Sequence, residues 1–226
     1  PVNSALPFHL PYLDDEIIQP VTNAWAQNNG WCWQIPTKHR RGCGYVFCDD
    51  FVTPDQAHAE LEQTIGRKVD PIRHIKFDSG RQEQLWIKNV LSIGLAGAFA
   101  EPLEATSIHT TIMQLKHFVF SCLGATKEET CNTGTVDDYN KKNAHLYDTM
   151  KDFLVAHYTC GRKDTEFWKY INSGATATDF VKSMHEVCKH RVPNATLFPR
   201  PEGGAGWPLW SYVLAGTGKL TAEVAE

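Results

Sequence analysis

Strand-like patterns stop near Gly124, and this change in periodicity constrains the fold more than any other feature of the sequence. Before Gly124, short apolar stretches alternate with turns and helical patterns, and after it apolar residues recur at helical spacing. We therefore predict an α/β fold. Residues 1–124 would form a module with a mixed sheet, and residues 125–226 a helical region.

Local signals place the first strands and the first helix. The density of prolines among the first 30 residues favours extended strands and turns over a helix. Apolar and aromatic residues on either side of a basic turn at 38–42 predict two strands between Trp31 and Cys48. Thr53 then caps a helix that has Pro54 at its first position and ends at Gly66.

Further elements follow from the same signals. The apolar residues after Thr106 recur every three or four positions, which predicts one helix of about five turns. Thr135-x-x-Asp138 resembles a capping box that opens a long helix. The clearest loop is Gly203–Gly206. The remaining expected elements are strands at 72–77 and 86–93, the second covered on both faces, and helices at 164–171 and 178–190.

Composition excludes several classes of protein. A chain of 226 residues, 42% hydrophobic and 21% charged, can bury a substantial core. The net charge of −4 and the lack of a long basic block argue against nucleic acid or a membrane surface as partner. Seven cysteines without Cys-x-x-Cys spacing indicate free thiols, and we expect a cytoplasmic protein. Because the chain opens at Pro1, we expect residues to precede it in the complete protein.

Two tryptophans stand at alternate positions of the first expected strand pair. Trp31 and Trp33 would direct both indoles to one side, where they can pack as core or line the site of a flat aromatic ligand. The stretch from Trp31 to Pro36 reads Trp-x-Trp-x-Ile-Pro. This pattern resembles the signature that separates flavin-dependent halogenases from related flavin hydroxylases.

A run of small residues leads into the helix expected at Thr106. Small side chains would let a flat ring approach the backbone. A helix start at Thr106 and Ser107 offers amides and the positive end of the helix dipole to an anion. Gly94 to Ser107 resembles the Gly-x-Ala-x-Gly-Phe-x-Glu-Pro-Leu-Glu-Ser-Thr segment of tryptophan halogenases, with Ala105 in place of the family's usual serine.

The resemblance implies roles for individual residues. Glu104 matches the carboxylate that faces the substrate, where it would stabilise a cationic intermediate and accept a proton. The alternatives without a role in the reaction are that Thr106 is only a helix cap and that Glu101 is a solvated helix-entry residue. The other implied site residues are Thr106 and Ser107 for the halide, Leu95, Gly97 and Ile108 for the flavin, and Trp31, Trp33 and Pro102 near the flavin.

A third match lies in the helical region. His157-Tyr158, Arg162, Asp164 and Phe167-Trp168 resemble the family's His-Tyr…Arg-x-Asp…Phe-Trp. We assign these residues a structural role in which they hold one helix against the next. We predict no metal site, because His185, Cys188 and His190 do not share a helix face well and no fourth ligand is evident.

The resemblance covers roughly the whole chain and implies an oxidoreductase. Residues 1–124 would be the C-terminal part of a flavin, halide and substrate module, followed by the helical region. The implied reaction uses reduced FAD, oxygen and a halide ion to halogenate an electron-rich indole or phenol through hypohalous acid. A separate flavin reductase would be a transient partner, and a homo-oligomer is possible. The family's dinucleotide-binding loop and catalytic lysine have no counterpart in this sequence.

Alternative functions stay open from the sequence. A flavin-dependent aromatic monooxygenase would share the fold but should lack Trp-x-Trp-x-Ile-Pro. A non-catalytic remnant would bind an aromatic ligand or a partner, and a purely structural interpretation would leave the match from Glu101 to Ser107 without a cause. Leu197–Glu202 does not match the aromatic-rich lid that tryptophan halogenases use for free tryptophan. An aromatic substrate other than free tryptophan is therefore expected.

Overall fold

The computed structural model describes residues 1–199 and 203–225. The chain forms two compact units, each with its own core. The first consists of Pro1–Asp78 and Arg162–Ala175, and the second of Ser79–Gly161 and Thr176–Glu226. Strands and helices occur in both, which confirms the predicted α/β class. The predicted functional division at residue 124 stays a prediction, although every described element after it is a helix.

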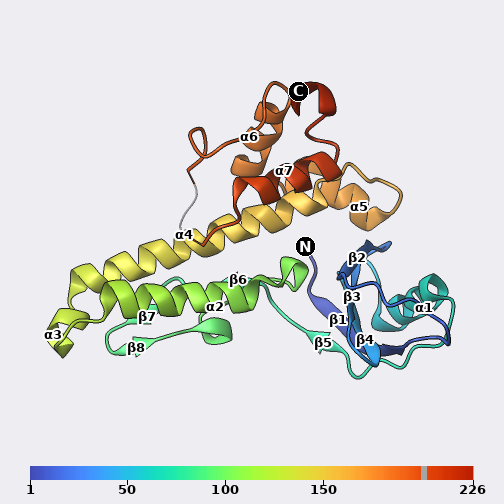
Figure 1. The fold of residues 1–226 in the computed structure, drawn as a ribbon, viewed down its shortest axis with the longest axis horizontal. Coiled ribbons are helices and arrows are strands. Elements are labelled where there is room, and N and C mark those ends of the chain that lie inside the picture. The colour runs from blue at the N-terminus through green and yellow to red at the C-terminus, as the bar shows by residue number, and fades with distance from the viewer. Residues whose placement is uncertain (200–202, 226) are drawn as a thin grey trace. The chain divides into compact units, whose positions relative to one another are not determined.

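A five-stranded sheet organises the first unit (Figure 1). Every described strand pair in it is antiparallel, which narrows the expected mixed sheet to an antiparallel one in this part of the chain. The order is β2-β3-β4-β1-β5, with β1 at Ser4–Pro11, β2 at Asn23–Ala26, β3 at Gly30–Pro36, β4 at Arg40–Phe47 and β5 at Ile75–Lys76.

Helix α1, at Pro54–Ile65, packs against one face of this sheet and confirms the predicted helix. Thr53 accepts a hydrogen bond from the amide of Gln56, and Gly66 closes the helix with a φ of 76°. Left-handed backbone of this kind suits glycine, which has no Cβ to clash. The buried side chains that form the core beneath α1 include Leu6, Phe8, Cys32, Tyr45, Phe47, Ala57 and Leu61.

The segment after α4 returns to the first unit. It contains α5, at Glu166–Tyr170, and a π-helical turn at Ile171–Ala175. The indole nitrogen of Trp168 donates to the carbonyl of Gln27 over 2.7 Å, and Arg162 donates to the same carbonyl over 2.9 Å. The structural role predicted for these two residues is confirmed, but they hold the turn between β2 and β3 rather than a second helix.

Two short antiparallel strand pairs begin the second unit. Strand β6, at Gly80–Arg81, pairs with β9, at Ala98–Phe99, and β7, at Trp86–Ile87, pairs with β8, at Val90–Leu91. The predicted continuous strand at 86–93 is therefore wrong, because Lys88 adopts a φ of 54° and reverses the chain. The strand predicted at 72–77 is reduced to β5. The side chain of Asn140, rather than a neighbouring strand, bonds the backbone at the start of the β7–β8 hairpin. Its oxygen accepts from the amides of Leu85 and Trp86 at 2.9 and 2.8 Å.

Helix α4, at Thr133–Tyr158, is the longest described helix of the second unit, and α2 runs alongside it (Figure 1). The predicted capping box at Thr135 is wrong by one turn, because Asn132 is the cap and accepts from the Thr135 amide over 2.9 Å. The helix predicted at 178–190 is confirmed as α6, at Asp179–Cys188. The other described helices here are α3 at Lys127–Thr130, α7 at Trp207–Gly216 and α8 at Ala222–Ala225.

A core of apolar side chains joins α4, α6 and α7. Trp210 and Leu214 on α7 are fully buried and pack with residues of the other two helices. The sequence did not predict α7, although the loop at Gly203–Gly206 before it is confirmed. Arg200, Pro201 and Glu202, in the segment expected to differ from the tryptophan lid, lie outside the described residues.

Helix α2, at Thr106–His117, continues as a π-helical turn at Phe118–Cys122, which together fill the predicted helix of about five turns. Along this helix, polar side chains are buried and large apolar side chains are exposed. Ile108 is 75% exposed, whereas Thr110 and Gln114 are buried. Gln114 accounts for part of this, because its side-chain oxygen accepts the Gly94 amide over 3.1 Å.

Two properties of the described residues bear on function. All seven cysteines are free thiols, as predicted, and burial raises the pKa of Cys32 to about 12, which makes it inert. No helix in residues 1–199 or 203–225 combines the length and apolar character needed to cross a bilayer.

Candidate active site

The predicted catalytic carboxylate lies in a short turn that leads into α2. This turn contains a 3₁₀ helix at Leu103–Ala105 with Pro102 before it. Glu104 and Ala105 have φ values of 64° and 52°. Non-glycine residues rarely adopt this conformation, and such strain tends to cluster at active sites. The turn buries Leu103 and leaves the Glu104 side chain 41% exposed.

A buried hydrogen bond anchors the start of this turn. Glu101 is 4% exposed, and the hydroxyl of Tyr158 donates to its carboxylate over 2.6 Å. A carboxylate is costly to bury unless it is hydrogen-bonded, so this contact ties the turn to the end of α4. The alternative that Glu101 is a solvated helix-entry residue is therefore wrong.

Glu104 has a histidine partner. The Nε2 atom of His157, in the last turn of α4, lies 3.2 Å from Oε1 of Glu104. The other ring nitrogen, Nδ1, lies 2.8 Å from the carbonyl oxygen of Phe153. The hydrogen bond from His157 holds the pKa of Glu104 below its ordinary value of 4.5, although partial burial acts in the opposite direction.

Replacing His157 with phenylalanine should raise the pKa of Glu104. The change removes the hydrogen bond that lowers this pKa and keeps the burial that raises it. The measurement is ¹³C NMR titration of the Glu104 side-chain carboxyl in both proteins. Because folding lowers this pKa in the wild type, the contribution of the pair to stability is present above the unfolded pKa and is lost as the pH falls through the folded pKa. An unchanged pKa in the variant would contradict the contact.

The predicted halide residues open α2. Thr106 is 6% exposed, and its hydroxyl has no hydrogen-bond partner among the described residues. Most buried hydroxyls in proteins are satisfied, so this one is suited to a small bound group. Ser107 follows in the first turn, where backbone amides and the helix dipole favour an anion. The residues present therefore fit a halide ion beside Glu104.

The predicted flavin contacts in this unit differ in exposure. Leu95 is 73% exposed and Ile108 is 75% exposed, so both are available to a flat ligand. Gly97 is buried, and a Cβ there would lie 2.8 Å from the side chain of Leu85. Internal packing thus explains the glycine without a ligand, and its role as a flavin contact stays a prediction.

The two predicted tryptophans lie in the first unit, on β3. Trp31 is buried and Trp33 is half-buried, with their ring centroids 6.0 Å apart. The Trp33 ring covers Gly44 on β4, where a Cβ would lie 2.0 Å from Cη2 of that indole. The tryptophans therefore form one group, and the residues from Leu95 to Ile108 form another in the second unit.

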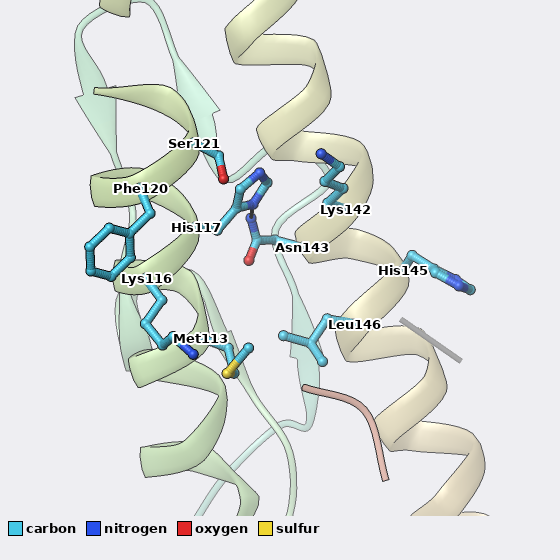
Figure 2. Close-up of a pocket in the computed structure, with 9 residues that line it drawn as sticks. All are labelled: Met113, Lys116, His117, Phe120, Ser121, Lys142, Asn143, His145 and Leu146. Atoms are coloured by element: carbon cyan, nitrogen blue, oxygen red, sulfur yellow. Dashed lines mark hydrogen bonds between the residues drawn. The ribbon is translucent and has the colours of Figure 1, made fainter. Parts of the chain in front are cut away.

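A separate cavity of about 410 Å³ lies between α2 and α4 (Figure 2). His117 and Asn143 point toward each other in it, and Asn143 Nδ2 lies 3.0 Å from His117 Nδ1. Lys116 and Lys142 contribute positive charge to its lining. None of the predicted site residues lines this cavity. Within the described residues, no cluster of three or more His, Cys, Asp or Glu side chains could hold a metal ion.

Sequence reasoning missed His157 and Tyr158 as site residues. The His-Tyr pair was expected to hold one helix against the next, but the structure places the two side chains against Glu104 and Glu101. The available signal was that two neighbouring polar residues end a long helix, each able to meet one carboxylate of the Glu-Pro-Leu-Glu segment.

Comparisons with known proteins show the family that this chain resembles. The model of the family described as tryptophan halogenase matches residues 1–226. Tryptophan 6-halogenase SttH of Streptomyces toxytricini is 35% identical over 97% of this chain and 42% of its own length. Tryptophan 7-halogenase RebH of Lentzea aerocolonigenes is 34% identical over 74% of this chain and 32% of its own length.

A solved structure shows the same fold. It is a tryptophan C-6 flavin-dependent halogenase (chlorinase) from taromycin biosynthesis, which superposes with a TM-score of 0.86 at 31% identity over 100% of this chain and 44% of the other. The chain thus spans less than half the length of each of these relatives. A family model that matches every residue, together with this structural likeness, establishes that the chain belongs to the tryptophan halogenase family.

Proposed function

We propose that this chain supplies the halide site and the acid–base carboxylate of a flavin-dependent halogenase that acts on an electron-rich aromatic compound. The observation that carries the proposal is the strained turn at Glu104 and Ala105, which sets an exposed carboxylate directly before the start of α2. The same few residues thereby offer a negative group for a cationic intermediate and a positive helix end for an anion.

Glu104 would act in the substitution step. Electrophilic attack of the halogen on an aromatic carbon leaves that carbon with both halogen and hydrogen and spreads positive charge over the ring. A carboxylate beside the ring stabilises this charge. It then accepts the proton, so that the electron pair of the broken C–H bond restores the aromatic ring. The net change is ArH and HOX to ArX and water.

Thr106 and Ser107 would hold the halide before it is oxidised. A halide carries its charge without hydrogen-bond donors of its own, so it needs donors from the protein and a favourable field. The first turn of α2 provides such a field, and the unpartnered hydroxyl of Thr106 provides a donor. Both residues follow Glu104 within three positions, which keeps halide and carboxylate in one region.

FAD fits the exposed apolar residues of the second unit. Leu95 and Ile108 present large apolar side chains to solvent, a suitable surface for a flat ring. When bound in its reduced form, FAD supplies with oxygen the oxidising power that converts halide into hypohalous acid. A separate flavin reductase would deliver it, and Pro102, in the same unit, would lie near it.

The substrate class is proposed as an indole or a phenol. Both rings are rich enough in electrons to react with a hypohalous acid. The relatives SttH and RebH are named as tryptophan halogenases, and tryptophan contains an indole. The choice between free tryptophan and another indole or phenol is an outcome of the assay.

Mass spectrometry of products tests this function. The complete protein is incubated with FAD, a flavin reductase, NADH, bromide and a panel of indoles and phenols that includes tryptophan. The expected result is a product with the paired isotope peaks of bromine, absent when bromide or FAD is omitted. Oxygen added without bromine would favour an aromatic monooxygenase instead, and bound FAD without any product would favour a non-catalytic remnant.

A further inference from the structure

We propose that His157 accepts the substrate proton from Glu104 and passes it to solvent. This inference deepens the function proposed above and rests on it. The two side chains come from segments 53 positions apart in the sequence and meet at 3.2 Å between Nε2 and Oε1. The proposal concerns a residue that acts through Glu104 and does not itself touch the substrate.

A contact with the backbone determines which ring nitrogen of neutral His157 carries the proton. A carbonyl oxygen can only accept a hydrogen bond, so the 2.8 Å contact with Phe153 requires a proton on Nδ1. The neutral ring then presents a lone pair on Nε2 toward Glu104, and the charged ring presents Nε2–H. Phe153 also restrains the ring by packing edge to face with a centroid distance of 4.8 Å.

This tautomer makes the pair able to carry one proton. When Glu104 takes a proton from the aromatic carbon, its new hydroxyl can donate to the lone pair on Nε2. Transfer to Nε2 regenerates the Glu104 carboxylate and leaves His157 as a cation, an arrangement in which each group stabilises the charge of the other. The imidazolium then releases the proton to water, which it can reach because 19% of its side chain is exposed.

Among the described ion pairs, Glu104 is paired with His157 and with no other charged side chain. The other carboxylate of the turn, Glu101, is bonded to Tyr158, the residue next to His157. The described ion pairs include none in which a lysine or arginine meets Glu104. The lowered pKa of Glu104 belongs to the charged state of the ring, in which Nε2–H donates to the carboxylate, and this is the state that the proton transfer produces.

His157→Gln tests the proton transfer and separates it from simple positioning. A glutamine can set its amide nitrogen near the place of Nε2 and donate to Glu104, but it cannot accept a proton. We expect kcat for bromination to fall by roughly tenfold or more, with KM within about twofold of the wild type. His145→Gln, an exposed histidine on the same helix, is the matched control and should keep both values. Full kcat in His157→Gln would show that a hydrogen bond to Glu104 is sufficient and would overturn the proposal.

A second measurement needs no activity. Long-range ¹H–¹⁵N NMR of histidine-labelled protein, at a pH where histidines are neutral, reports which ring nitrogen carries the proton, and the His157→Gln spectrum assigns the signal. We expect the proton of His157 on Nδ1, and a proton on Nε2 would overturn the inference. If the wild type makes no halogenated product, the proposed function fails. If it does and His157→Gln matches it, only the proton transfer fails.

Discussion

Replacing Glu104 with glutamine in the complete protein is expected to lower the rate of aromatic halogenation by about a hundredfold or more. Glutamine keeps the size and a hydrogen bond to His157 but loses both the negative charge and the ability to accept a proton. FAD binding should stay nearly unchanged, since Glu104 belongs to a turn that Glu101 and Tyr158 hold independently. The measurements are product formation by mass spectrometry and FAD affinity by fluorescence quenching.

The control for this change is Glu128→Gln, an exposed carboxylate in the first turn of α3. It removes one negative charge from the same unit without touching the turn before α2, so the rate should stay the same. A Glu104→Gln protein with the wild-type rate would remove Glu104 from the mechanism. Loss of FAD binding together with activity would show that the substitution acts through the structure of the turn.

Replacing Gly44 with alanine should destabilise the first unit by about 1–3 kcal/mol and displace the indole of Trp33. Gly44 stands opposite Trp33 in the β3–β4 register, and a methyl group there would lie 2.0 Å from the ring. The ring must therefore move. Chemical denaturation reports the loss of stability, and circular dichroism reports the coupling of the Trp31 and Trp33 rings, which lie 6.0 Å apart.

Gly42→Ala is the matched control for this substitution. Gly42 lies two positions before Gly44 on the same strand and the same face, and a Cβ there meets nothing within 4 Å. It should leave the circular dichroism of the tryptophans unchanged and cost no stability. Equal stability and equal spectra for the two alanine variants would contradict the packing of Trp33 over Gly44.

Elements governed by neighbouring residues were predictable from the sequence. Helix α1 is the clearest case, because Thr53, Pro54 and Gly66 each act within one turn of the helix end they define. The strands β3 and β4 were predictable for a similar reason, since two apolar stretches flank a short basic turn.

Elements governed by distant residues were not. The stretch at 86–93 has the composition of a strand, but it bends at Lys88, and Asn140 on α4 bonds its backbone. In α2 the hydrophobic pattern predicts the helix but not its orientation, because Gln114 is buried by bonds to Gly94 and Tyr147. Neither contact leaves a trace in the local sequence.

The same distinction applies to the candidate site. Glu104, Thr106 and Ser107 could be predicted as site residues because they are neighbours within one segment that resembles a family motif. The left-handed backbone of Glu104 and Ala105 was not foreseen, since no glycine marks it. His157 could not be joined to Glu104 before folding brought the end of α4 to the turn.

The central claim is that the turn from Leu103 to Ser107 holds a halide ion beside the Glu104 carboxylate. The most direct measurement is crystallography of the complete protein with bromide, using the anomalous signal of bromine to locate the ion. We predict a bromide within hydrogen-bond distance of the first turn of α2, in contact with Thr106 or Ser107. Bromide bound elsewhere in an active protein, with nothing at the start of α2, would contradict the account.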